Sequence, residues 1–153
     1  MMTPEELRKK LTGPIVAMTT HFTPDDKIDV PAMQRLTEFY IDQGIQTVIA
    51  DGSTGEFASL SDEERRLVIK TVCETANGRM TVIAGTACPG TKLTIELTNY
   101  AEEVGADGVM ITPPYYGFSG FEGLKKHYRD ISSATNLGII VYFSGAVMHT
   151  VSN

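Results

Sequence analysis

The chain has 153 residues, of which 42% are apolar and 21% are charged, and its formal net charge is -6. This length and composition are typical of a globular protein with its own core, so we expect residues 1–153 to form a single domain. The negative charge and the lack of a basic run argue against a nucleic-acid partner or an anionic membrane surface. No apolar run approaches the ~20 residues that span a bilayer.

The first residues predict a short helix rather than a targeting segment. Thr3, Pro4 and Glu6 form a capping-box pattern with proline in the first turn, and the segment lacks the apolar core of a signal peptide. Cys73 and Cys88 have neither the spacing of metal ligands nor the pattern of a disulfide framework. We therefore expect a reduced, cytoplasmic protein.

Five short β-type runs follow, and their starts lie roughly 30 residues apart, which is the length of one strand-and-helix unit. The predicted strands cover residues 15–18, 47–50, 81–84, 108–111 and 138–142. Four segments between them have apolar residues at helical i, i+3/i+4, i+7 spacing, which predicts helices that each cover one face of a sheet. The four apolar stripes are Met33, Leu36 and Tyr40; Val68, Val72 and Ala76; Leu93, Leu97, Tyr100 and Val104; and Phe121, Leu124, Tyr128 and Ile131.

Local signals agree with these helices. Asp29 precedes Val30 and Pro31 at one start, and Ser61 with Glu64 forms a second capping box at another. The glycines expected to cap the helix ends are Gly44, Gly78 and Gly105.

The alternation of strands and helices predicts an α/β fold with a parallel sheet and right-handed crossovers. Two architectures fit this order: a doubly wound open sheet, and part of a (β/α)₈ TIM barrel. The strands are short and end in small or hydroxyl residues, which favours a barrel over the long apolar strands of an open sheet. Because a whole barrel needs about 250 residues, we expect a parallel (β/α)₈ barrel truncated after about five strands.

The carboxyl ends of the strands form the ligand-binding edge in either architecture. The most informative end is the segment that contains Gly52, Ser53, Thr54 and Gly55. Its glycines allow close approach of the backbone, and its hydroxyls and N–H groups can donate hydrogen bonds to a small carboxylate or phosphate. It is not a P-loop, because no Gly-Lys-Ser/Thr follows.

The other strand ends, at residues 19–21, 85–88, 113–117 and 142, are rich in hydroxyls and nearly empty of cationic groups. They contain no 2-His-carboxylate cluster and no Ser-His-Asp pattern placed for acyl transfer. We therefore expect neither a metal nor another cofactor.

A set of motifs runs along nearly the whole chain, from about residue 13 to residue 142. They are Gly52-Ser53-Thr54-Gly55-Glu56 with Leu60-Ser61 and Glu64-Arg65; Val82-Ile83-Ala84-Gly85-Thr86; Gly105-Ala106-Asp107-Gly108 leading to Pro113-Pro114-Tyr115-Tyr116; Ile140-Val141-Tyr142; and Phe22-Thr23-Pro24-Asp25 with Ile28-Asp29. In combination they resemble the dihydrodipicolinate synthase / N-acetylneuraminate lyase family. The resemblance implies a class I aldolase-type lyase on a (β/α)₈ barrel, which forms or cleaves a C–C bond with pyruvate or a related 2-oxo acid. It also implies a lysine Schiff base and a homotetramer built as a dimer of dimers.

Carried over residue by residue, the resemblance implies that Thr54 binds the substrate carboxylate, beside Gly52 and Ser53. Ser53 would also link two tyrosines in a proton relay. Tyr142 would be the acid/base group above the imine, and Tyr116 would reach across a dimer interface into the neighbouring site. An amine nucleophile suits this chemistry because the protonated imine is an electron sink.

Three features depart from the family pattern. The family's Schiff-base lysine lies at the end of a sixth strand, beyond Asn153, so we expect this chain to be inactive alone. Its own lysines are all interpreted as helix or loop surface: Lys9, Lys10, Lys27, Lys70, Lys92, Lys125 and Lys126. In the segment from Phe143 to Asn153, Val147 stands where dihydrodipicolinate synthases place an arginine, so neither the second substrate nor the reaction direction is assigned. His21 also stands where the family commonly has proline.

Other polar residues are interpreted as structural. Glu56 is expected to stabilise the turn, and Cys88 to be an inert thiol. The run 63–66 reads as a solvated helix face. Tyr115 and Tyr116 are adjacent and should point opposite ways, so one of them is expected to be structural. The histidines interpreted as ordinary surface or loop residues are His21, His127 and His149.

Two other functions fit the residues less well. A non-catalytic half-barrel could bind a small carboxylate or associate with another chain, because five open parallel strands leave an exposed sheet edge. A complete flavodoxin-like domain would bind a phosphorylated ligand, but residues 19–22 after the first strand offer no glycine for a phosphate nest.

Overall fold

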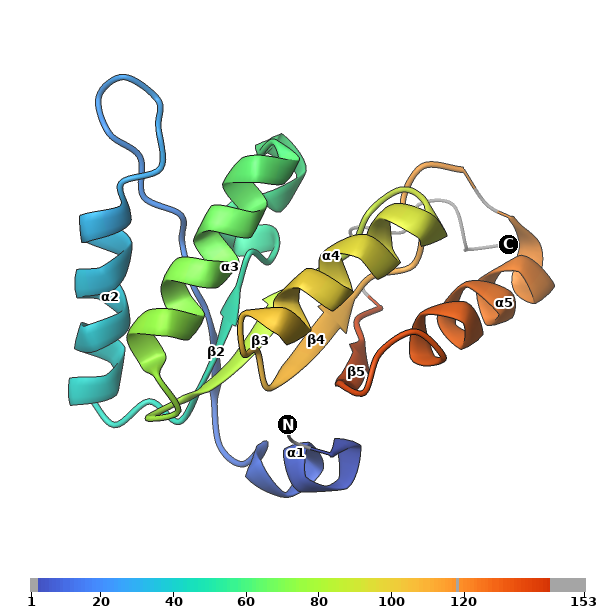
Figure 1. Cartoon of the computed structure of the whole chain (residues 1–153), viewed down its shortest axis with the longest axis horizontal. Coiled ribbons are helices and arrows are strands. Elements are labelled where there is room, and N and C mark those ends of the chain that lie inside the picture. Colours follow the sequence, from blue (N-terminus) through green and yellow to red (C-terminus); the bar gives the residue numbers. More distant parts are fainter. Residues whose placement is uncertain (1–2, 118, 144–153) are drawn as a thin grey trace.

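The computed structural model describes residues 3–117 and 119–143 of the chain. Strands and helices alternate along it as the sequence predicts (Figure 1). The elements are α1 (Pro4–Lys10), β1 (Ile15–Ala17), α2 (Val30–Asp42), β2 (Thr47–Ala50), the short 3₁₀ helices η1 (Ser53–Gly55) and η2 (Phe57–Ser59), α3 (Asp62–Ala76), β3 (Thr81–Gly85), α4 (Thr91–Glu103), β4 (Gly108–Ile111), α5 (Gly120–Ser132) and β5 (Gly138–Val141). No helix within the described ranges is both long and apolar enough to cross a membrane.

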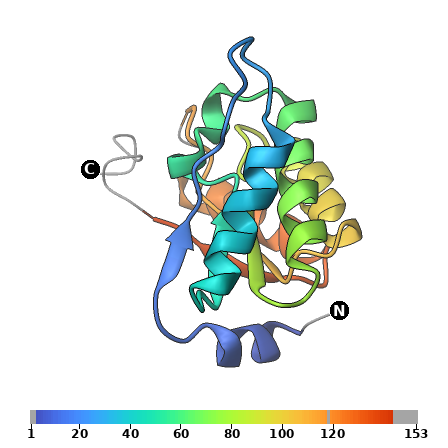
Figure 2. The ribbon, with the colours of Figure 1, turned by 90° about the vertical axis from the view of Figure 1, so that its left-hand side faces the viewer.

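The strands form one parallel sheet in the order β1-β2-β3-β4-β5, so each strand pairs with the next one in sequence. Val48 of β2 lies opposite Val82 of β3, and Val109 of β4 lies opposite Ile139 of β5. Helices α2, α3, α4 and α5 lie along one face of this sheet (Figures 1 and 2). A doubly wound sheet carries helices on both faces, so the one-sided placement here identifies part of a (β/α)₈ barrel.

The core lies between the sheet and these four helices. Each helix contributes fully or nearly fully buried side chains of its predicted stripe: Met33 from α2, Val72 from α3, Leu97 from α4 and Ile131 from α5. The stripes of α4 and α5 begin later than predicted, because Leu93 and Phe121 in their first turns are 45% and 64% exposed.

Helix α1 packs against the amino-terminal ends of β4 and β5. Leu7 is 3% exposed, and a Cβ at Gly108 or Gly138 would lie 2.5 or 2.6 Å from Leu7 Cδ2. Glycine at these two strand starts therefore lets α1 come close. The carboxyl ends of the strands lie at the opposite edge (Figure 1).

Both predicted capping boxes are present, at Thr3 with Glu6 and at Ser61 with Glu64. The glycines after the helices have positive φ, as expected of C-caps, although α3 also uses Asn77 at φ 44°. Three strands end one residue away from their predicted limits, at Ala17, Gly85 and Val141. The amide of Tyr142 still donates to Ile111 O over 3.0 Å, so the pairing of β5 with β4 continues to this residue.

Candidate functional site

The turn after β2 is the centre of the candidate site. The chain leaves β2 at Asp51, passes through η1 and reaches Glu56, and both of these residues lie in the left-handed region at φ 60°. Gly52 is buried within the turn, whereas Ser53 and Thr54 are exposed. The turn therefore presents two hydroxyl side chains at the carboxyl edge of the sheet.

The loop after β1 holds this turn in place. The Thr20 hydroxyl donates to Gly55 O over 2.7 Å in a buried contact, and the Gly55 amide donates to Gly52 O over 3.0 Å. A Cβ at Gly55 would lie 3.1 Å from Met18 O and 3.2 Å from Thr20 Oγ1. Glycine thus allows a close approach that fixes the backbone beside the two exposed hydroxyls.

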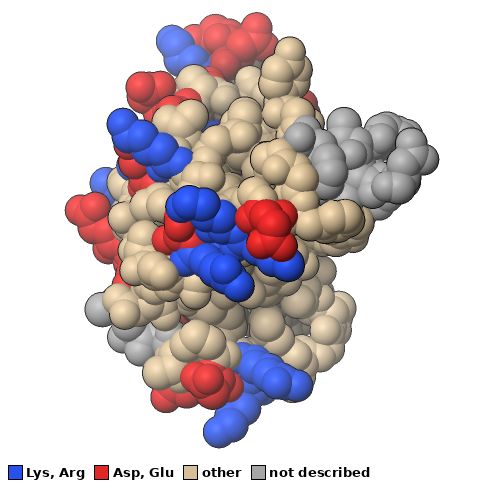
Figure 3. All heavy atoms as spheres, turned by 90° about the vertical axis from the view of Figure 1, so that its right-hand side faces the viewer, with Lys and Arg blue, Asp and Glu red and all other residues tan. Residues whose placement is uncertain are grey.

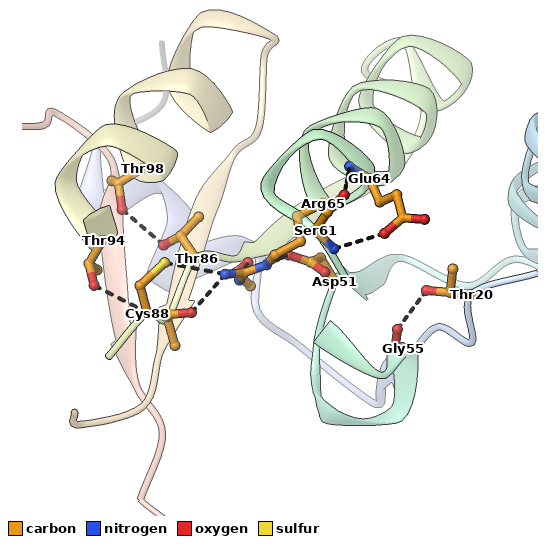
Figure 4. Close-up of polar contacts among 12 residues, drawn as sticks. Thr20, Asp51, Gly55, Ser61, Glu64, Arg65, Thr86, Cys88, Thr94 and Thr98 are labelled. Carbon is orange, nitrogen blue, oxygen red and sulfur yellow. Dashed lines mark hydrogen bonds and ion pairs between the residues drawn. The ribbon is translucent and has the colours of Figure 1, made fainter. Parts of the chain in front are cut away.

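Arg65 reaches the same edge of the sheet from α3 (Figure 4). Its Nε donates to Asp51 Oδ2 over 2.8 Å, and its Nη2 donates to Gly85 O over 3.1 Å. Its Nη1 donates to Ala87 O over 3.0 Å and to Cys88 Sγ over 3.3 Å. The Arg65 and Asp51 side chains are 4% and 0% exposed. One buried cation therefore joins the end of β2 to the loop after β3.

This position of Arg65 corrects two interpretations: that residues 63–66 form a solvated helix face, and that the strand ends nearly lack cations. The capping box at Ser61 starts α3, and Arg65 lies in the first turn and a half of that helix. It precedes Val68 by three residues and Val72 by seven, so it belongs to the buried stripe of the helix. That spacing is the sequence signal that could have identified Arg65.

Burial controls the ionisation of the groups around Arg65. Desolvation raises the pKa of Asp51 to about 7, although the charge of Arg65 opposes this shift. Burial also raises the pKa of the Cys88 thiol, although the charge of Arg65 opposes this shift too. Cys88 is therefore a protonated thiol near neutral pH, in agreement with its interpretation as unreactive.

Aromatic side chains extend this cluster toward the loop after β4. The Arg65 guanidinium carbon lies 5.1 Å from the centroid of the Phe57 ring, and the Phe57 and Tyr115 ring centroids are 5.8 Å apart in an edge-on contact. Tyr115 is half-buried, whereas the neighbouring Tyr116 is 87% exposed. The adjacent tyrosines thus face different surroundings, and Tyr115 is the structural one.

A small cavity lies among the carboxyl ends of β2, β3 and β4. Its volume is about 10 Å³, and it is lined by Asp51, Gly52, Ser53, Phe57, Gly85, Ala87, Met110 and Thr112. A Cβ at Gly85 would lie 2.0 Å from Asp51 O, so only glycine lets the two strand ends meet there. The site therefore combines a hydroxyl-bearing turn, a buried ion pair and the close contact of the β2 and β3 ends at Asp51 and Gly85.

The protein-family model of the dihydrodipicolinate synthetase family matches residues 10–148 of the chain. The chain belongs to this family. The relatives support the assignment in sequence: 4-hydroxy-tetrahydrodipicolinate synthase of Methylococcus capsulatus is 44% identical over 132 residues, which are 86% of this chain and 45% of that protein.

Solved structures of family members match the fold as well. Dihydrodipicolinate synthase of Acinetobacter baumannii, solved in complex with pyruvate, has a TM-score of 0.85 and 39% identity over 89% of this chain and 47% of its own. N-acetylneuraminate lyase of Mycoplasma synoviae has a TM-score of 0.83 and 32% identity over 90% of this chain and 48% of its own. The chain thus spans about half the length of the relatives it matches.

The residues that the family pattern assigns to catalysis are only partly brought together. Gly52 and Ser53 line the cavity, and Thr54 adjoins them in η1. Tyr142 follows β5 and is 38% exposed. Across residues 3–117 and 119–143, no hydrogen bond joins Ser53 to Tyr116 or to Tyr142. The roles of these residues in substrate binding and proton transfer stay predictions, and Val147 lies outside the described residues.

All seven lysines are exposed, and each lies on a helix or a loop, as the sequence predicts. Lys125 and Lys126 of α5 are typical, since they pair with Glu122 and Asp130 at 2.7 Å. On that face of the molecule, basic and acidic side chains are interspersed (Figure 3). None of these lysines lies at the carboxyl end of a strand.

His127 corrects the interpretation of the histidines as surface or loop residues. It is 3% exposed within α5, its Nδ1 lies 2.9 Å from Thr91 Oγ1, and its ring packs edge-on against Tyr128 at 5.1 Å. It precedes the buried Ile131 by four residues and so lies on the inner face of the helix. His21 is exposed as expected, and His149 lies outside the described residues. In the described part of the chain, no three His, Cys, Asp or Glu side chains gather as a metal site.

Proposed function

We propose that this chain supplies the carboxylate-binding part of a lyase site that acts on pyruvate or a related 2-oxo acid. The observation that carries the proposal is the turn after β2, where Gly55 fixes the backbone and Ser53 and Thr54 stay exposed at the carboxyl edge. In this role Thr54 binds the substrate carboxylate through its hydroxyl and backbone N–H. Gly52 is buried beside Ser53 and Thr54, and a Cβ there would lie 3.0 Å from Ile49 Cγ2, so glycine lets the turn pack closely against β2.

The bond-making step in this proposal uses a lysine Schiff base. The amine condenses with the 2-oxo group and water leaves, and the protonated imine then accepts the electron pair of the C–C bond that is cleaved or formed. The seven exposed lysines lie on helices and loops, which supports a nucleophile outside these five strands. The chain alone is then inactive as a lyase.

Proton transfer in the proposed site falls to Tyr142, with Ser53 linking it to a second tyrosine. Tyr116 is that second tyrosine, and it reaches the site from a neighbouring subunit. Its 87% exposure supports this role, because a ring that packs against its own chain would be covered. The assembly we propose for the whole protein is a cytoplasmic dimer of dimers, and the free thiols of Cys73 and Cys88 fit a reducing compartment.

A second candidate function is a non-catalytic half-barrel that binds a small carboxylate or associates with another chain. The observation that favours it is the apolar surface along the two edge strands. Ile15 on β1 is 39% exposed, and Val141 and Phe143 at the end of β5 are 54% and 58% exposed. Exposed edges of this kind pair with other chains.

Pyruvate titration of the isotope-labelled chain, followed by amide NMR shifts, tests the proposal. We expect the amides of Ser53 and Thr54 to shift with pyruvate and not with acetone, which lacks the carboxylate. Thr54→Val should weaken the affinity at least about tenfold, because it removes a hydrogen bond to a charged group. Thr12→Val, at an exposed threonine near the other end of the strands, is the matched control and should bind like wild type. Equal affinity of the two variants would contradict the proposal.

A further inference from the structure

Two buried oxygens lack a hydrogen-bond partner at the edge of the candidate site. They are Asp51 Oδ1 and Thr112 Oγ1, and no partner for either lies among the described residues. Asp51 is 1% exposed and Thr112 is 4% exposed, so bulk water does not satisfy them. Both residues line the same cavity, which also touches Ser53.

Leaving such groups unpaired is unfavourable, because each has lost its hydration on folding. The other oxygen of Asp51 already accepts from Arg65, so only Oδ1 remains to be satisfied. The rest of the cavity lining includes the apolar side chains of Phe57, Ala87 and Met110. Ser53 also lines the cavity, but Asp51 Oδ1 forms no hydrogen bond with its hydroxyl.

The size and chemistry of the cavity select its occupant. A volume of about 10 Å³ accommodates about one water molecule and excludes a three-carbon acid. An anion is also disfavoured in this cavity, because it would lie against the carboxyl group of Asp51. A water can donate one hydrogen to Asp51 Oδ1 and exchange a second hydrogen bond with the Thr112 hydroxyl, which both donates and accepts.

We propose that one buried water occupies this cavity and bridges Asp51 Oδ1 to Thr112 Oγ1. The bridge joins the end of β2 to the residue after β4, and Arg65 joins β2 to the loop after β3. Asp51 is then held through both carboxyl oxygens, and the turn that begins at Asp51 is fixed from two sides. The water site does not depend on the proposed function; only its value for placing Ser53 beside a substrate rests on that function.

A pair of threonine variants tests the bridge through stability. Thr112→Val removes the hydroxyl at nearly constant volume and should lower the melting temperature by roughly 3 °C, because Asp51 Oδ1 loses its bridged partner. Thr47→Val is the matched control, since Thr47 Oγ1 is also buried and unpaired but does not line this cavity. We expect no loss for Thr47→Val, and near wild-type stability for Thr112→Ser. Equal melting temperatures for the two valine variants would overturn the proposal.

Water–protein NOE spectra of the labelled chain test the occupant itself. We expect a cross-peak between a long-lived water and the Ala87 methyl or the Gly85 amide, both at the cavity, and its loss in Thr112→Val. Destabilisation by Thr112→Val without a water cross-peak in wild type would show a direct contact between Thr112 and Asp51 and overturn the proposal. Neither readout involves pyruvate, so failure of the pyruvate titration leaves this test unaffected.

Discussion

Arg65 donates from Nε to Asp51 Oδ2 over 2.8 Å, and the two side chains are 4% and 0% exposed. The pair links α3 to Asp51, the residue at which the turn after β2 begins. Arg65 also bonds the carbonyls of Gly85 and Ala87, so its placement sets how the ends of β2 and β3 lie relative to one another. A buried charge of this kind is strongly destabilising when its partner is removed.

Arg65→Met should therefore destabilise the chain by about 3–5 kcal/mol, because Asp51 and the two carbonyls lose their buried donor. The matched control is Arg66→Met at the next residue, whose guanidinium lies 4.6 Å from the Tyr100 ring and is half-buried. This control should cost about 1 kcal/mol or less. Urea unfolding of both variants measures the difference, and similar losses would contradict a structural role for the Asp51–Arg65 pair.

Gly85→Ala should destabilise the chain by about 3 kcal/mol or more, because the added Cβ would lie 2.0 Å from the backbone oxygen of Asp51. Gly90→Ala is the control, since no atom lies within 4 Å of a Cβ at Gly90. We expect that variant to change stability by only about 0.5 kcal/mol. Thermal unfolding by circular dichroism compares them, and a wild-type melting temperature for Gly85→Ala would show that the strand ends can separate.

The fold could be predicted from the sequence because its signals are local. The capping boxes at Thr3 and Ser61 and the short β-type runs each depend on residues within a few positions of one another. The strand order followed from the regular alternation of strands and helices. The one-sided placement of the helices distinguishes the barrel from the open sheet. The sequence indicates it less directly, through strand length, strand-end residues and the family resemblance.

The site was less predictable, because its central contact joins residues that are distant in sequence. Asp51 and Arg65 lie 14 positions apart. The charged run around Arg65 resembles a solvated surface, and only its spacing from Val68 indicates burial. The burial of His127 is hard to predict for the same reason. A histidine is usually interpreted as a surface residue, and only its position four residues before Ile131 indicates that it is buried. Polar residues on a buried stripe need a partner that the sequence does not identify.

The buried His127 should make stability depend on pH. Burial lowers its pKa, against the opposing effect of Asp130. Below about pH 6.5 the histidine of the unfolded chain binds a proton that the folded chain resists, so the contribution of His127 to stability falls as the pH drops. Asp51 acts in the opposite direction, because its raised pKa of about 7 lets the folded chain bind a proton that the unfolded chain does not. The loss from His127 reaches at most about 1.4 kcal/mol per pH unit.

Urea unfolding between about pH 7 and pH 5 measures this dependence. As the pH is lowered over this range, we expect His127→Gln to become more stable relative to wild type, because glutamine does not titrate. His21→Gln, at an exposed position, should keep the wild-type dependence. Identical slopes for wild type and His127→Gln would contradict the assignment of a neutral, buried His127.

We propose that the turn after β2 binds the substrate carboxylate and that none of the lysines of this chain forms the Schiff base. Treatment of the purified chain with pyruvate and borohydride, read by intact mass, tests this proposal, with the Methylococcus capsulatus relative treated in parallel. We expect an unchanged mass for this chain, because its seven lysines are exposed on helices and loops. A stoichiometric adduct, mapped by peptide digestion to any of those lysines, would contradict it.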